Sequence, residues 1–200
     1  MQEIKAWLKK LQVPQPDVVI CNAGVFEFKP VLELSEEEMM TAWQSNVFGV
    51  WRTIKAATPR SKLVVISSEG AILARTPYTW PYVGTKKALE DLVACLQLEQ
   101  PTLKTTIVRP GAMRTPMLDQ LANLKSADPK VRFMWTVAQY CARWYSSSVD
   151  AVAAGVVEIV EEPRPPRFRN IGHNPILRLI SALPEIVTSF TLRLTLAFID

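Results

Sequence analysis

Three short runs of apolar and β-branched residues most limit the folds open to this chain. Residues 17–21 (DVVIC), 63–67 (LVVIS) and 105–109 (TTIVR) are almost continuously apolar or β-branched and do not alternate with polar residues. Strands of this kind are buried on both faces, which is typical of parallel sheets. Each run is followed by enough residues for a helix before the next one begins. The pattern therefore predicts an α/β protein with a parallel sheet.

Helical patterns occupy the spaces between these runs. Residues 1–12 form an amphipathic pattern, and Ser35 with Glu38 makes a capping box that opens a second helix. The predicted apolar stripe of that second helix contains Met40, Trp43, Val47, Val50, Trp51 and Ile54. Residues 82–97 and 149–160 are predicted as further helices, and residues 168–172 as a last short strand.

The composition fits one packed domain and excludes several kinds of site. The 200 residues are 48% hydrophobic and 21% charged, and the net charge of +4 does not by itself indicate nucleic-acid binding. The three cysteines are far apart and form no CxxC pair, so neither a disulfide framework nor a zinc site is predicted. A single histidine, His173, excludes mechanisms that need two imidazoles. We expect no metal site and a reducing, cytoplasmic location.

Neither end of the chain is predicted to span a membrane. Residues 1–12 carry several charges and no apolar run, unlike a signal peptide. The most apolar stretch, residues 176–199, is interrupted by Arg178, Pro184, Glu185 and Arg193. Two short helices packed on the core are predicted there, with peripheral membrane contact or a dimer contact as the alternatives. Residues 161–170 (EEPRPPRFRN) are predicted to be a stiff surface connection, and a proline-motif ligand or a phosphate patch is the alternative.

Two side chains on the predicted helix 82–97 can carry acid–base chemistry. Tyr82 and Lys86 are four residues apart, so they lie on one helical face. A nearby ammonium favours the phenolate of a tyrosine, whose pKa is otherwise about 10, and such a pair can exchange a proton near neutrality. Ser67 and Ser68 follow the second strand, at the edge of a parallel sheet where ligands bind. Taken singly, a chance Tyr–Lys pair and a turn serine remain alternative interpretations.

Two further features can contribute to a site: an asparagine on a predicted helix and the loop that follows the third predicted strand. Asn46 falls at the margin of an apolar stripe, where a buried amide without a partner costs about 1–3 kcal/mol. A satisfied structural amide is the alternative to a functional one. After the third strand, Pro110-Gly111 and then Thr115 form a loop that can contact a bound ligand.

The order of these motifs resembles that of the short-chain dehydrogenase/reductase family. Asn-Ala-Gly after a strand is followed by Asn-x-x-Gly, Ser-Ser, Tyr-x-x-x-Lys and Pro-Gly-x-x-x-Thr-Pro. The resemblance covers about residues 17–117, and the helix–PRPP–strand tail to residue 172 is similar to the family's C-terminal end. It implies a Rossmann-like, doubly wound parallel sheet in a single domain, 1–200. The implied segments are a first helix (1–16), a catalytic core (17–111), a substrate lid (112–147) and a C-terminal helix, strand and helices (148–200).

The resemblance also implies a role for each motif in an NAD(P)-dependent oxidoreductase that interconverts a ketone or aldehyde and an alcohol. Tyr82 would exchange the proton, Lys86 would lower the pKa of Tyr82 and bind the nicotinamide ribose, and Ser68 would hold the substrate oxygen. Asn46 would anchor a water that links Lys86 to solvent. The implied contacts to the cofactor come from Asn22, Ala23, Gly24, Pro110, Gly111 and Thr115, besides Tyr82 and Lys86.

Two departures from the family pattern affect these expectations. Ser68 lies one residue further from Tyr82 than is usual, and with Ser67 adjacent we assign the role to Ser68. Family members also begin with a strand, a glycine-rich turn and further βα elements, so roughly 60 residues are expected to be absent here. No two of the seven glycines are closer than 14 positions, so a phosphate-binding glycine loop is not present elsewhere in these residues. We therefore expect an N-terminally truncated fold, without its first βαβαβ half, that binds cofactor poorly.

The expected substrate is a small molecule of the bulky, lipophilic ketone or alcohol class (a steroid, polyketide, terpenoid or acyl compound) and not a sugar. Residues 112–147 indicate this because they are rich in aromatic and other apolar side chains. The alternative is that these side chains only pack the lid. The expected cofactor is NADP or NAD, with NADP favoured, and a homo-oligomer is a possible assembly. A catalytically dead relative that serves as a binding or scaffold protein is the competing function. A hydrolase that uses Ser68 is a third alternative, which is disfavoured because the 200 residues contain no Gly-x-Ser-x-Gly turn and the single histidine lies near the C-terminal end.

Overall fold

A single parallel sheet forms the centre of the computed structural model. The structure describes residues 2–13, 15–72, 77–113, 115–117 and 128–172. Within them the strands are β1 (Val18–Cys21), β2 (Lys62–Ile66), β3 (Lys104–Pro110) and β4 (Phe168–Ile171). They lie in the order β1-β2-β3-β4, and every neighbouring pair is parallel. The predicted α/β class and parallel sheet are confirmed.

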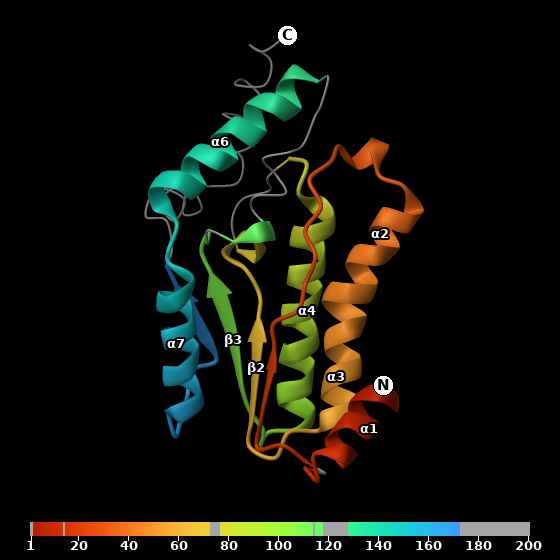
Figure 1. The fold of residues 1–200 in the computed structure, drawn as a ribbon, viewed down its shortest axis with the longest axis vertical. Helices are drawn as coiled ribbons and strands as arrows, with labels where there is room; N and C mark the ends of the chain where they lie inside the picture. The colour runs from red at the N-terminus through yellow and green to blue at the C-terminus, as the bar shows by residue number, and fades with distance from the viewer. Residues whose placement is uncertain (1, 14, 73–76, 114, 118–127, 173–200) are drawn as a thin grey trace.

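Helices cover both faces of this sheet (Figure 1). On one face lie α1 (Gln2–Lys10), α3 (Gly49–Ala57) and α4 (Trp80–Glu99), and on the other lies α7 (Val149–Glu161). The first face is packed by Leu8, Val50, Leu89 and Val93 from the helices against Val19, Leu63, Val65 and Ile107 from the strands. The second face is packed by Ile159 against Val64 and Val108. This doubly wound arrangement is the one that the sequence predicts.

The helix that follows Ser35 begins as predicted but does not continue as one regular helix. The Ser35 hydroxyl accepts from the Glu38 backbone N–H at 3.1 Å, and Glu38 Oε2 accepts from the Ser35 N–H at 2.8 Å. Helix α2 (Glu36–Trp43) then passes through a π-helical turn, η2 (Gln44–Phe48), before α3 begins. The extra residue of a π turn rotates the following helix relative to the preceding one. The predicted stripe is wrong at Met40, before this turn, and at Trp51, after it, since these side chains are 45% and 43% exposed.

Strand β1 lies at an edge of the sheet in the described part of the chain. It pairs with β2, and Val19 and Cys21 are buried. Ile20, which faces the other side, is 48% exposed. The expectation that this strand is buried on both faces is therefore wrong here, because α7 packs on β2 and β3 and leaves Ile20 open.

A helix lies above the carboxyl ends of the strands (Figure 1). This helix, α6 (Pro129–Tyr145), belongs to the predicted lid, of which residues 114 and 118–127 lie outside the described residues. Val131 and Met134 of α6 are buried against Phe28, with Trp135 and Tyr78 beside them. Within the described part, none of the helices has the length and apolarity needed to cross a membrane. The stretch 176–199 lies outside it, so the membrane or dimer contact expected there stays a prediction.

Candidate active site

The end of β2 and the first half of α4 bring three of the predicted residues together. The Ser68 and Tyr82 side chains form a hydrogen bond, and Ser68 Oγ also accepts from the Gly70 N–H at 3.1 Å. Lys86 Nζ lies 5.6 Å from the centre of the Tyr82 ring and donates to the Ile66 carbonyl at 2.8 Å. The predicted hydroxyl, phenol and ammonium thus meet at the carboxyl edge of the sheet.

The neighbouring serine has a different partner. Ser67 is 2% exposed, and its hydroxyl donates to Glu90 Oε1 at 2.6 Å. Because Ser67 is engaged there, Ser68 is the hydroxyl that faces Tyr82. The geometry therefore supports the assignment of Ser68, despite its longer spacing from Tyr82.

Burial controls the ionisation of both α4 side chains. Desolvation raises the pKa of Tyr82 above its ordinary value, and the hydrogen bond from Ser68 opposes that rise. Desolvation also lowers the pKa of Lys86 to about 8. The resemblance implies a lowered pKa for Tyr82, and here the direction is the opposite, because burial of the phenol outweighs the stabilisation of its anion.

Asn46 joins the segment after β1 to α4. It is fully buried in η2, where its Oδ1 accepts from the Val25 N–H at 2.8 Å. Its Nδ2 donates to the Val25 carbonyl and to Thr85 Oγ1, each at 2.9 Å. These bonds satisfy the amide as a structural link, and Thr85 lies next to Lys86 in sequence. The implied role in anchoring a water stays a prediction.

The Asn-Ala-Gly segment follows β1 directly and reaches the same side chains. A Cβ at Gly24 would lie 3.1 Å from Asn46 Oδ1 and 3.4 Å from Lys86 Nζ, so a larger residue would crowd both. Asn22 and Ala23 are exposed at this edge. A bound molecule can therefore approach the edge beside them.

The predicted loop after β3 also lies at the carboxyl edge. Pro110 ends β3, and the Gly111 N–H donates to the Ile171 carbonyl at 2.9 Å, which fixes the loop on β4. Thr115 follows, half-buried. Its predicted contact with a nicotinamide stays a prediction.

Sequence reasoning missed two groups of side chains around this site. The Phe26 ring lies 4.8 Å from the Tyr82 ring, and Phe28 contacts Tyr78 with ring centres 5.6 Å apart. Glu90 forms a two-pronged ion pair with Arg109. Two signals could have found them: aromatic residues at alternate positions after Asn-Ala-Gly, and an acid four residues after Lys86.

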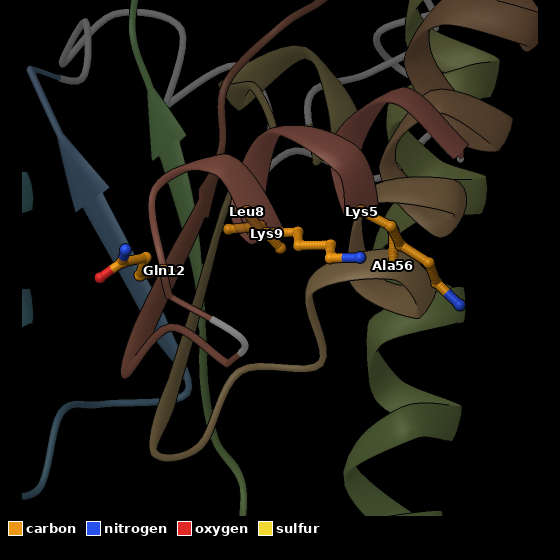
Figure 2. A pocket seen from close by; sticks show the side chains of 5 residues that line it. All are labelled: Lys5, Leu8, Lys9, Gln12 and Ala56. Carbon is orange, nitrogen blue, oxygen red and sulfur yellow. The ribbon is translucent and has the colours of Figure 1, made fainter.

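One hollow in the described part of the chain lies away from these residues. It has a volume of about 470 Å³ and is lined by Lys5, Leu8, Lys9, Gln12 and Ala56 (Figure 2). These residues belong to α1, the turn after it and the end of α3, and none of them is a predicted site residue. Among the described residues, no three His, Cys, Asp or Glu side chains gather as a metal site would require.

Comparison with known proteins identifies the family. The sequence model described as short chain dehydrogenase matches residues 1–125, a range that includes every site residue named above. The chain belongs to the short-chain dehydrogenase family.

Individual relatives agree with this membership. This short-chain dehydrogenase is 30% identical over 119 residues to an uncharacterised NAD-dependent oxidoreductase of Mycobacterium tuberculosis, covering 55% of this chain and 43% of the relative. Its structure is similar to that of an alcohol dehydrogenase from Thermococcus sibiricus complexed with 5-hydroxy-NADP, with 29% identity and a TM-score of 0.64. That match covers 84% of this chain and 68% of the other.

A further solved structure shows the same fold. A short-chain dehydrogenase from Streptomyces avermitilis aligns with a TM-score of 0.72 at 23% identity, covering 97% of this chain and 73% of that one. The present short-chain dehydrogenase chain spans less than half the length of the M. tuberculosis relative that it matches.

Proposed function

We propose that this chain carries the proton-transfer half of an NAD(P)-dependent oxidoreductase that interconverts a carbonyl compound and an alcohol. The observation that supports the proposal is the contact of Ser68 with Tyr82, with the Lys86 ammonium against the same ring. This trio lies at the carboxyl ends of parallel strands, where α/β proteins bind their ligands.

The residues fit the nicotinamide end of the cofactor. Among the described residues, the Ile66 carbonyl is the hydrogen-bond acceptor for Lys86 Nζ, and an ammonium has three donors, so donors remain for a ribose hydroxyl. When bound, the nicotinamide supplies or accepts a hydride. The 200 residues contain no glycine-rich turn for the pyrophosphate. NADP is our first expectation, and the ratio of the two dissociation constants would decide between NADP and NAD.

In the reducing direction, the chain's own groups handle the oxygen of the substrate. Ser68 donates a hydrogen bond to the carbonyl oxygen, and Tyr82 transfers its proton to that oxygen as the carbon receives a hydride. The C=O double bond thereby becomes a C–O single bond, with a new C–H bond from the hydride and a new O–H bond from the Tyr82 proton. The phenolate left on Tyr82 is stabilised by the Lys86 ammonium. Because burial raises the pKa of Tyr82, the phenol is protonated at neutral pH, as a proton donor must be.

The surroundings of Tyr82 favour a lipophilic substrate. Phe26 contacts the Tyr82 ring, and Phe28 and Tyr78 extend this apolar wall. Val131 and Met134 of α6 complete the cluster above it. A bulky ketone or alcohol can leave water and pack against this apolar wall, whereas a polyol there would lose its hydrogen bonds to water.

The decisive experiment replaces Tyr82 by Phe in whichever form of the protein, this chain or a longer product of the same gene, consumes NADPH or NADH with a carbonyl compound. We expect kcat/KM to fall by at least about 100-fold, because general acid–base catalysis contributes that much. The parent is assayed with an aryl alkyl ketone and with a polar sugar ketone, and we expect the first to be the better substrate.

Tyr140→Phe removes the same hydroxyl from an exposed position on α6 and serves as the control. Full activity of Tyr82→Phe would overturn the proposal. A preference for the sugar ketone would overturn the substrate class alone. Turnover by no form of the protein would favour the scaffold alternative.

A further inference from the structure

A charged cluster lies beside the catalytic trio and is not used by the proposed reaction. Arg109 Nε donates to Glu90 Oε1 at 2.9 Å, and Arg109 Nη2 donates to Glu90 Oε2 at 2.6 Å. The two side chains are only 15% and 12% exposed. The Arg109 guanidinium also lies 4.1 Å from the centre of the Phe168 ring on β4. Glu90 is thus held by a partly buried, two-pronged ion pair, which is geometrically specific.

The third member of the cluster is Ser67. Its hydroxyl donates to Glu90 Oε1 at 2.6 Å, so this one oxygen accepts from both Ser67 and Arg109. Ser67 is the residue between Ile66, whose carbonyl binds Lys86, and Ser68, which binds Tyr82. The charged cluster therefore holds Ser67, the residue between two that contact the trio, through its side chain.

Three consecutive residues, the last of β2 and the two that follow it, thus contact three residues of α4 at four-residue spacing. The Ile66 carbonyl accepts from Lys86, the Ser67 hydroxyl donates to Glu90, and Ser68 bonds Tyr82. Residues four apart lie on one helical face, so a single face of α4 contacts all three residues of this segment. The Glu90 contact is the one of the three that a buried ion pair fixes in place.

The two serines are chemically identical neighbours, so something must decide which of them faces Tyr82. A carboxylate that already holds an arginine accepts strongly from one hydroxyl and leaves the other for the phenol. We propose that Glu90 is a positioning residue: held by Arg109, it binds Ser67 and thereby sets Ser68 against Tyr82. The inference rests on the proposed function, because it gives Glu90 a part in placing the substrate-binding hydroxyl.

A simpler interpretation is that the ion pair only holds α4 on the sheet. The ionisation of Tyr82 separates the two interpretations. Removing a negative charge near a phenol lowers its pKa, whereas losing the hydrogen bond from Ser68 raises it. Under a purely structural role, Glu90→Gln would lower stability and leave Ser68 against Tyr82, so the pKa of Tyr82 would stay unchanged or fall with the loss of the charge.

The test measures the titration of Tyr82 in this chain by ¹³Cζ-tyrosine NMR, with the resonance assigned from Tyr82→Phe. The variants are Glu90→Gln, Ser67→Ala and Ser68→Ala, and the control is Asp91→Asn, the same change of charge at the next, exposed position of α4. We expect Ser68→Ala, Glu90→Gln and Ser67→Ala each to raise the pKa of Tyr82. In the Ser68→Ala background, Glu90→Gln is expected to add nothing to this rise.

Two titration results would overturn the inference. One is a Glu90→Gln variant that behaves like Asp91→Asn or lowers the pKa of Tyr82. The other is a Glu90→Gln change that raises the pKa of Tyr82 as much in the Ser68→Ala background as it does in the parent. If Glu90→Gln does not fold, Ser67→Ala decides, because it removes one hydroxyl and leaves the ion pair intact.

An activity assay on the turnover-competent form keeps this inference separate from the proposed function. We expect Glu90→Gln and Ser67→Ala to lower kcat/KM by about tenfold or more, since small misplacements of reacting groups are costly, and Asp91→Asn to leave it unchanged. If Tyr82→Phe is inactive while Glu90→Gln is fully active, the inference fails and the function stands. If Tyr82→Phe is active, the function fails and the titration alone decides the placement of Ser68.

Discussion

Tyr82 and Lys86 show how burial sets the properties of single residues. Lys86 is buried and Tyr82 is partly buried in the first half of α4, and in both cases desolvation disfavours the charged form. The spacing of the two residues was readable in the sequence, but the extent of their burial was not. Burial depends on Phe26 and on the segment after β2, which come from distant parts of the chain. The direction of the Tyr82 shift could therefore not be predicted from the spacing alone.

Lys86 should make the stability of the chain depend on pH. Its pKa is lowered from an unfolded value of 10.5 to about 8, so between these values the unfolded state binds more protons and stability rises with pH. Between pH 8 and 10, the free energy of unfolding of the parent should rise by about 2 kcal/mol relative to Lys86→Met, on 1.36 kcal/mol per pKa unit. Urea unfolding of the parent and of Lys86→Met at each pH measures this difference in the free energy of unfolding.

The matched control is Lys87→Met, which removes the exposed ammonium next to Lys86 in sequence. It should follow the parent over the same range of pH. An equal pH profile for the parent and Lys86→Met would contradict the expected cost of burying the charge.

At the scale of elements, the strands and most helix positions followed from sequence because apolar runs and caps act locally. The capping box at Ser35 and Glu38 and the four strands were predicted in this way. The π turn at residues 44–48 was not, because a regular apolar spacing does not show an extra residue. That turn coincides with the buried Asn46, whose three hydrogen bonds hold it to Val25 and Thr85. A tertiary network therefore overrides the local pattern at this point.

The N-terminus of α2 should depend on its cap. Ser35→Ala removes the acceptor for the Glu38 N–H and should lower the free energy of unfolding by about 1 kcal/mol. Equilibrium unfolding in urea measures the difference. Ser45→Ala makes the same change inside η2, away from the cap, and should cost less. Equal costs for the two variants would show that the cap adds nothing to stability.

At the scale of the whole molecule, the parallel sheet and the helices on both of its faces were predictable from the alternation of strands and helices. The site residues that gather at the carboxyl edge were predictable only through the order of the motifs. Glu90 and Arg109 were missed because their pairing joins α4 to the end of β3, and no local pattern links the two. The exposure of Ile20 was missed because it depends on which elements cover the sheet.

The purified 200-residue chain should bind nicotinamide cofactors weakly. The residues that we propose for the nicotinamide end are present, but the 200 residues include no glycine-rich turn for the pyrophosphate, which usually sits at a helix N-terminus. We expect no change in NADPH or NADH fluorescence at micromolar cofactor. A member of the same family with its glycine-rich turn serves as the positive control. A clear fluorescence change with this chain would contradict the expectation.

Strand β1 leaves one row of its backbone N–H and C=O groups without a strand beside it among the described residues. Such a border attracts other extended peptides, including further copies of the same polypeptide. In concentrated preparations, the β1 strands of different molecules would then pair with one another, and light scattering would increase with protein concentration. A lysine in place of Ile20 would be a simple way to keep such preparations clear.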